Sequence, residues 1–280
     1  MSQRMIESFA RDLGRLRHEP IQKRVRAVAG EATMVDTTRA LLVWEPRRVV
    51  PSYAAPLADV RGELVAAAAS PAVSEPSGVR IDGLPDQMIL DPSVPFRAHT
   101  ADGEPLGLET PQGIRVHVAF RPADRDLADH VILDFDGFDA WYEEDERVLG
   151  HARDPLHSMD ILPSSRRVRI ELDGVVLADT TRARLLFEGT LLPPRAYVAR
   201  EDVRVALRPS AKRTRCAYKG EASYWSAELG DGGTATDVAW TYEAPLRPAA
   251  EIGGLVAFFN ERVDLSLDGE PLPRPLTPWS

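Results

Sequence analysis

Residues 167–189 read RVRIELDGVVLADTTRARLLFEG, and residues 24–46 read RVRAVAGEATMVDTTRALLVWEP. The two stretches align without a gap, and the alignment continues to residues 204 and 61 with about a third of the positions identical. Both copies open on Arg-Val-Arg, share Asp-Thr-Thr-Arg-Ala in the middle and close on Asp-Val-Arg. A repeat of this length at a constant offset indicates a tandem duplication.

Each copy has the pattern of strands. In the second copy, apolar and polar residues alternate on both sides of Asp173-Gly174, which predicts a β-hairpin. The first copy has Ala-Gly-Glu-Ala at 29–32 instead, so we expect the same hairpin with different turn chemistry. Residues 128–145 and 253–269 each contain two apolar runs around an Asp-Gly or Asn-Glu turn, and we interpret both as further hairpins.

Helical periodicity is clear only near the N-terminus, where Ile6, Phe9, Leu13 and Leu16 fall on one face before Pro20. The chain is therefore predicted to be mainly β, with a short leading α-helix. We expect these segments: an N-terminal helix in 1–20, a diverged first copy in 21–150, a linker in 151–158, the second copy in 159–270 and a proline-rich tail in 271–280.

The first copy carries an insertion near residues 62–95 that is rich in Ala, Ser and Pro. One interpretation is a flexible surface insertion. The other is a lid over the pocket of the second copy. Both interpretations leave the second copy as the one that holds the complete set of candidate site residues.

The bulk composition excludes several classes of protein. A net charge of −9 and a pI near 5.3 argue against a nucleic-acid partner. No run approaches the roughly 20 apolar residues that span a bilayer, so no membrane partner is expected. One cysteine allows neither an internal disulfide nor a thiolate zinc site. We expect a cytoplasmic protein, and the bias toward Arg, Ala and Pro suggests a bacterial, GC-rich genome.

Five motifs resemble, in order, the bacterial and fungal family called domain of unknown function 427. They are residues 167–189, PPRAYVAREDVR at 193–204, TRCAYKGEASYW at 214–225, DVAWTYEAPL at 237–246 and IGGLVAFFNERVDLSLDGE at 252–270. The resemblance covers residues 159–270 closely, and the first copy looks like a diverged member. The family usually has Cys-Pro-Tyr-Lys-Gly where this chain has Ala217.

The resemblance implies two tandem β-tent-like or β-barrel-like domains. Zinc-binding β-tent relatives use cysteine pairs, which this chain lacks, so a structural zinc is not implied. The family sometimes carries a nucleotidyltransferase-like label. Asp134-Phe135-Asp136 has the spacing of a magnesium-binding pair, but no glycine turn for a phosphate precedes it. We identify no metal or nucleotide motif, and the cofactor stays unknown.

Cys216 and Lys219 are the candidate catalytic residues. A thiol becomes a useful nucleophile beside a cation, and Arg213, Arg215 and Lys219 are close in sequence. The alternative for Cys216 is a small buried hydrophobic residue. The alternative for Lys219 is a solvated side chain in a glycine turn. No histidine lies in 159–270, so a Cys–His pair would have to borrow one from elsewhere.

Six more residues are candidates for binding a substrate: Glu188, Arg195, Tyr197, Tyr218, Tyr224 and Trp225. Arg195 and Tyr197 match family motifs and do not recur in the first copy. Glu188 recurs as Glu45, as Asp202 does as Asp59, and recurrence favours a structural role. The aromatic residues can also be ordinary strand packing.

His151, Arg153, Asp154 and His157 lie in the predicted linker. They could form a metal or acid–base site, or they could pin the linker between the copies. The spacing of the two histidines fits no standard ligand pattern.

Our first functional hypothesis is a small-molecule enzyme with its pocket in the second copy or between the copies. In it Cys216 reacts, Lys219 contacts an anion or carbonyl, and Arg195 and Tyr197 position the substrate. The alternatives are a non-catalytic metabolite-binding module and a structural pseudo-dimer scaffold. The expected partner is a small-molecule ligand, and the expected state is a monomeric pseudo-dimer or a homo-oligomer.

Overall fold

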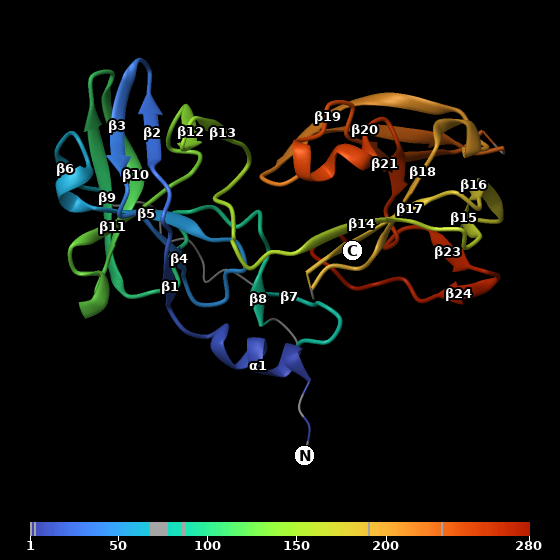
Figure 1. Cartoon of the computed structure of the whole chain (residues 1–280), viewed down its shortest axis with the longest axis horizontal. Coiled ribbons are helices and arrows are strands. Elements are labelled where there is room, and N and C mark those ends of the chain that lie inside the picture. The colour runs from blue at the N-terminus through green and yellow to red at the C-terminus, as the bar shows by residue number, and fades with distance from the viewer. Residues whose placement is uncertain (1, 3, 68–77, 86–87, 190, 231) are drawn as a thin grey trace. The chain divides into compact units, whose positions relative to one another are not determined.

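The computed structural model describes residues 2, 4–67, 78–85, 88–189, 191–230 and 232–280 (Figure 1). Strands make up 48% of the chain and helical turns 9%, which confirms the predicted mainly β class. None of the helices in the described part of the chain combines the length and apolar composition that a membrane span needs.

The N-terminal helix α1 (Met5–Asp12) is shorter than the apolar periodicity predicts. It buries Ile6 and Ala10. The chain then turns, and Arg17–Pro20 forms strand β1, which pairs with β4 (Leu41–Trp44). The short leading helix is confirmed, but its predicted extent to Pro20 is wrong, because Arg17–Pro20 is paired in a sheet.

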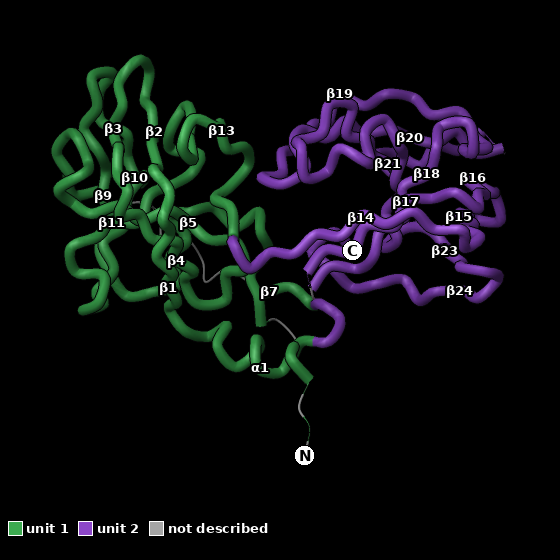
Figure 2. Tube along the Cα trace, viewed as in Figure 1, with its two compact units in different colours: residues 1–80, 84–154 green, residues 81–83, 155–280 purple. Residues whose placement is uncertain are grey.

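The chain divides into two compact units (Figure 2). Unit 1 comprises residues 1–80 and 84–154, and unit 2 comprises residues 81–83 and 155–280. The insertion predicted near 62–95 is thus shared between the units. Its residues 68–77 and 86–87 lie outside the described residues.

Unit 1 contains a seven-stranded and a four-stranded antiparallel sheet. The larger sheet has the order β1-β4-β5-β11-β10-β9-β6, with β5 (Ser52–Pro56), β11 (His130–Leu133), β10 (Gly113–Pro122), β9 (Gly103–Thr110) and β6 (Leu64–Ala66). The smaller has the order β13-β12-β2-β3, with β13 (Glu146–Val148), β12 (Ala140–Glu143), β2 (Val25–Ala29) and β3 (Ala32–Thr37). The insertion adds the short pair β7 (Gly78–Val79) and β8 (Ile89–Leu90), and the helical turns are η1 (Leu57–Asp59) and η2 (Arg125–Leu127).

Unit 2 repeats this arrangement. Its seven-stranded sheet has the order β14-β17-β18-β22-β21-β20-β19, with β14 (Met159–Pro163), β17 (Arg184–Glu188), β18 (Arg195–Val198), β22 (Val256–Phe258), β21 (Thr234–Thr241), β20 (Gly220–Glu228) and β19 (Leu207–Cys216). Its four-stranded sheet has the order β16-β15-β23-β24, with β16 (Val175–Thr180), β15 (Val168–Leu172), β23 (Asp264–Leu267) and β24 (Glu270–Leu272). The helical turns are η3 (Arg200–Asp202) and η4 (Arg247–Ile252).

The order of the strands along the chain maps one unit onto the other, sheet by sheet. The register agrees as well: Leu41 pairs with Ala54 in unit 1, and Arg184 pairs with Tyr197 in unit 2, at the same offset as the sequence repeat. Identical topology is what a duplication would produce, and duplication stays our interpretation of the repeat.

The Asp173-Gly174 hairpin is confirmed. It joins β15 to β16, and both turn residues have positive φ, 50° and 78°, as a type I′ turn requires. In unit 1, Gly30 takes φ 58° at the corresponding turn between β2 and β3, so the hairpin is kept.

The other two predicted hairpins are wrong. Strands β11 and β12 belong to different sheets of unit 1, and β22 and β23 belong to different sheets of unit 2. In both places the turn carries the chain from one sheet to the other. The sequence pattern identified the strands and missed the crossing, because alternation does not say which sheet a strand joins.

Each face of the large sheet of unit 2 has its own set of buried side chains. One face packs on the four-stranded sheet through residues such as Val198, Ala227 and Phe258. The opposite face is aromatic and is covered by η4. Its largest buried members are Tyr197, Tyr224, Trp240, Tyr242 and Phe259. We call this second set the aromatic face.

Candidate functional site

Three ionisable side chains meet at one place in unit 2. Glu188 is the last residue of β17, His157 lies just before β14, and Lys219 lies in the turn between β19 and β20. His157 Nε2 is 3.1 Å from Glu188 Oε1, and the same oxygen accepts a hydrogen bond from Lys219 Nζ. We call these three residues the Glu188 cluster.

The Glu188 cluster joins opposite edges of the large sheet. Strands β14 and β17 stand at one edge, whereas β20 and β19 stand at the other. Lys219 can reach Glu188 only because the sheet curls, so the tip of the β19–β20 hairpin comes back over the aromatic face. Residues far apart in sequence and in strand order therefore form one site.

Glu188 is ionised at neutral pH. Burial alone would raise its pKa, but the hydrogen bond from His157 and the charge and hydrogen bond of Lys219 outweigh that effect and lower the pKa to about 2. Only 8% of the Glu188 side chain and 10% of the Lys219 side chain are exposed, compared with 19% for His157. A buried charge pair beside a more exposed imidazole is the electrostatic core of the site.

The turn that carries Lys219 also carries Cys216 and Tyr218. The Tyr218 ring stacks on His157 with a centroid distance of 4.0 Å. Cys216 is half-buried, and its sulfur accepts a hydrogen bond from the Tyr218 backbone N–H at 3.5 Å. Gly220 closes the turn with φ 99°, a backbone conformation that favours glycine. The turn thus places the thiol, a phenol and an ammonium group within five residues.

Two buried phenols lie near this turn. Burial raises the pKa of Tyr197, and nearby Glu188 and Cys216 add to the shift. Burial likewise raises the pKa of Tyr242, with added contributions from Tyr197, Cys216 and Glu188. Both phenols therefore stay protonated, and Tyr197 accepts a hydrogen bond from Trp240 Nε1 at 3.0 Å. The predicted residue Tyr197 lies beside the Glu188 cluster.

Arg195, the other preferred binding residue, is occupied elsewhere. Its guanidinium makes a bidentate ion pair with Glu261, at 2.7 and 2.6 Å, and Thr277 Oγ1 donates to the same carboxylate. Burial would raise the pKa of Glu261, but Arg195 and Thr277 lower it. The pair ties β18 to the segment between β22 and β23, and Thr277 adds the C-terminal segment, so these contacts favour a structural role for Arg195.

Tyr224 and Trp225 point to opposite faces of β20. Tyr224 belongs to the aromatic face, and its hydroxyl is 2.8 Å from Thr214 Oγ1. Trp225 packs toward the four-stranded sheet and donates to Thr241 Oγ1 at 3.1 Å. The structure therefore brings Tyr224 to the side of the site and leaves Trp225 on the other side of the sheet.

His157 belongs to the site although the sequence analysis placed it in a linker. There it was named only with His151, Arg153 and Asp154 as a metal or acid–base alternative, but residues 155–158 belong to unit 2. Met159 pairs with Glu188 across β14 and β17, so a residue two positions before Met159 falls on the same side as Glu188. That register, unknown from sequence, was the missing signal. Arg153 stays in unit 1, where it pairs with Glu146 at 2.6 Å.

Unit 1 keeps the buried carboxylate but surrounds it differently. Glu45 follows β4, as Glu188 ends β17. His99 Nδ1 is 3.1 Å from its Oε1, and Arg48 Nε is 3.9 Å away. The backbone N–H groups of Thr100 and Ala101 donate to its Oε2 at 2.8 and 3.2 Å. The segment between β8 and β9 thus supplies donors to the carboxylate in unit 1, where the Lys219 turn supplies one in unit 2.

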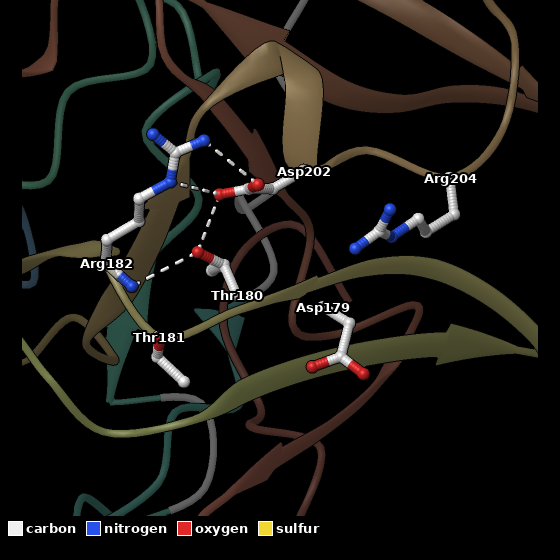
Figure 3. A pocket seen from close by; sticks show the side chains of 6 residues that line it. All are labelled: Asp179, Thr180, Thr181, Arg182, Asp202 and Arg204. Carbon is white, nitrogen blue, oxygen red and sulfur yellow. Dashed lines mark hydrogen bonds and ion pairs between the residues drawn. The ribbon is translucent and has the colours of Figure 1, made fainter.

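The repeated Asp-Thr-Thr-Arg motif forms a recess of about 340 Å3 in unit 2, shown in Figure 3. There Thr180 Oγ1 donates to Asp202 at 2.7 Å, and Arg182 pairs with the same carboxylate at 3.0 Å. In unit 1, Thr37 donates to Asp59 at 2.6 Å. The same bonds in both units support a framework role for this motif.

Acidic and histidine side chains do not gather into a metal site within the described ranges: they contain no group of three or more potential protein ligands. Asp134 and Asp136, which have the spacing of a magnesium-binding pair, form a local turn in which the Asp136 N–H donates to Asp134 Oδ1 at 3.2 Å. That geometry is the ordinary one for an aspartate at a turn.

A comparison with protein families matches the region of the chain that contains this site. Residues 160–269 match the family model described as a domain of unknown function (DUF427), and the match does not extend to the N-terminal half. The C-terminal region of the chain therefore belongs to this family. Glu188, Cys216 and Lys219 lie inside the matched range, and His157 lies just before it. No curated protein matched the chain.

Proposed function

We propose that unit 2 is a small-molecule enzyme whose reaction takes place at the Glu188 cluster. Cys216 is the nucleophile, Lys219 stabilises negative charge, and His157 transfers protons. Glu188 orients both His157 and Lys219, and Tyr197 and Tyr218 border the substrate.

The observation that carries this proposal is the buried Glu188 cluster itself. Burying charged groups costs several kcal/mol each unless strong pairing compensates, so such a cluster is an expensive way to hold two sheet edges together. Here it lies beside the sole thiol of the chain and two protonated phenols. Converging groups of this kind, with a carboxylate whose pKa is strongly shifted, are typical of reaction sites.

The roles follow from the contacts. Because His157 Nε2 faces Glu188, Nδ1 is the nitrogen left to exchange a proton, and it has no hydrogen-bond partner among the described residues. In the proposed reaction Cys216 gives its proton to His157 Nδ1, and the sulfur bonds to an acyl carbon while the carbonyl electron pair moves to oxygen near Lys219. The carbonyl then re-forms, and the leaving group departs with a proton from His157. Water, activated by the same histidine, finally breaks the thioester and restores the thiol.

The alternative is a binding module that holds a metabolite without reacting. The observation that favours it is unit 1, where an equivalent buried carboxylate is paired with a histidine but no cysteine is present. A carboxylate–histidine pair can therefore belong to this fold without catalysis.

An activated acyl ester separates the two functions. We expect p-nitrophenyl acetate to acetylate Cys216, visible as a mass increase of the intact chain, and then to be turned over for many equivalents. H157Q should slow release of the acetyl group, and C216S should abolish both steps. A binding module predicts no turnover above the C216S background.

The wider setting is also proposed. We infer a cytoplasmic, bacterial protein in which the two units arose by duplication and only unit 2 kept the reactive turn. The shared strand order and the repeated Asp-Thr-Thr-Arg bonds support that history.

A further inference from the structure

We infer that the group held by Glu188 and Lys219 is a planar carboxamide, which makes unit 2 specific for amide substrates. This inference rests on the proposed function and names its substrate class. It is carried by a comparison of the same buried carboxylate in the two units.

In unit 1 the carboxylate has a full set of N–H partners from its own chain. Two consecutive backbone amides, of Thr100 and Ala101, donate to Glu45 Oε2. His99 approaches Oε1, and its ring is stacked on Phe120 at 3.8 Å. In unit 1 the partners of Oε2 are therefore amide N–H groups, and a pair of stacked rings lies next to them.

In unit 2 the corresponding oxygen lacks such a partner. Glu188 is nine-tenths buried, with a relative exposure of 7%. His157 and Lys219 both contact Oε1, and no described residue donates to Oε2. Glu188 Oε2 is not among the fully buried side-chain atoms without a partner, so this oxygen keeps some accessible surface. A ligand N–H that reaches it would make a charge-assisted hydrogen bond.

Lys219 is the proposed partner for the carbonyl oxygen of the same carboxamide. Its ammonium carries three N–H groups, and Glu188 is the only acceptor for them within the described chain. A carboxamide presents an N–H and a carbonyl oxygen in one plane, so its N–H can reach Oε2 while its oxygen faces Lys219. A carboxylate or phosphate group would instead face the negative charge of Glu188. An ester offers no N–H for Oε2.

Benzamide and methyl benzoate test this pairing in the intact chain. Both have an aromatic ring and a carbonyl, but only benzamide has N–H groups. We expect benzamide to move the His157 imidazole proton signals in NMR, assigned by their loss in H157Q, and to slow acetylation of Cys216 at least fivefold at saturation. Methyl benzoate at the same concentration should do neither.

E188Q is the matched variant, and E45Q is its control. Glutamine keeps the shape of the side chain but presents an amide in place of the carboxylate, so E188Q should weaken benzamide binding at least tenfold. E45Q changes the equivalent residue of unit 1 and should leave it unchanged. If E188Q does not fold, the titrations of the wild-type chain with benzamide and methyl benzoate still test the inference.

Equal effects of benzamide and methyl benzoate on His157, or no effect of either, would overturn the carboxamide assignment. The same experiments test the proposed enzyme activity separately from the carboxamide inference. If Cys216 turns over the ester and benzamide has no effect, the amide inference fails and the enzyme stands. If benzamide shifts His157 and Cys216 stays unreactive, unit 2 is an amide-binding module and the enzyme fails.

Discussion

Glu188 links the stability of unit 2 to the chemistry of its site. The pKa of this carboxyl is about 2 in the folded chain and near 4.5 when it is solvated. A depressed pKa means that ionised Glu188 stabilises the native state, fully above pH 4.5, and that this contribution is lost as the pH falls from 4.5 toward 2.

We therefore predict that E188Q lowers the free energy of unfolding by about 3 kcal/mol at pH 6, because it leaves Lys219 buried without its partner. The difference from the wild type should shrink as the pH falls to 3. Urea unfolding of both proteins at the two pH values measures it. A difference that does not change with pH would contradict the assignment of ionised Glu188 as the partner of Lys219.

Asp134 behaves in the opposite way. Burial raises its pKa to about 6, above the 3.8 of a solvated aspartate, so its ionisation disfavours the native state as the pH rises through this range. D134N should stabilise the chain at pH 7.5 by on the order of 2 kcal/mol and have little effect at pH 4. Denaturant unfolding at both pH values checks this, with D136N as the exposed control. Destabilisation by D134N at pH 7.5 would refute it.

At the scale of elements, the β19–β20 hairpin is the device that assembles the site. Its turn carries Cys216, Tyr218 and Lys219, and its tip crosses to the β14–β17 edge. The turn depends on Gly220, whose φ of 99° would strain any residue with a Cβ.

G220A should cost about 1–2 kcal/mol of stability and slow acetylation of Cys216, because the turn must distort and Lys219 moves with it. G174A is the matched control. Gly174 also has a positive φ, 78°, with no atom within 4 Å of an added Cβ, and it lies in another hairpin of unit 2. Its stability cost should be similar, with no effect on the rate at Cys216. If G220A and G174A slow acetylation of Cys216 equally, the β19–β20 turn is not part of the reaction site.

Unit 2 shows which parts of the fold and of the site could be predicted from sequence and which could not. The Asp-Gly turn at 173–174 was predictable, because the residues that determine a tight turn are adjacent in sequence. Cys216, Tyr218 and Lys219 could be singled out as a group for the same reason. Glu188 was also a candidate, but its contact with Lys219 and with His157 could not be predicted, since strand register and the curl of a seven-stranded sheet bring these residues together. Trp225 was included although alternation along β20 places it on the other face from Tyr224.

At the scale of the whole molecule, two units of one topology surround an equivalent buried carboxylate with different residues. The framework is retained: a threonine and an arginine hold the same aspartate in both units. What differs is the segment that contacts the carboxylate: the segment between β8 and β9, with His99, in unit 1, and a short turn with Lys219 in unit 2.

The repeated framework bonds give a prediction for both units. T37V and T180V each remove a hydroxyl that donates to an aspartate and accepts a backbone N–H, so each should cost about 2 kcal/mol. The double variant should be additive within about 0.5 kcal/mol, because each bond lies inside its own unit. Urea unfolding of the three variants measures this. A cost from only one of them would contradict a shared framework role.

The measurement that tests the central claim most directly is the rate at which iodoacetamide alkylates Cys216 at pH 7, followed by intact mass. Every added group reports this thiol, because the chain has one cysteine. We predict faster alkylation in the native chain than in the same chain unfolded in urea, and loss of that advantage in K219M. A thiol that reacts only after unfolding, or equally fast in K219M and the wild type, would contradict a reactive site at the Glu188 cluster.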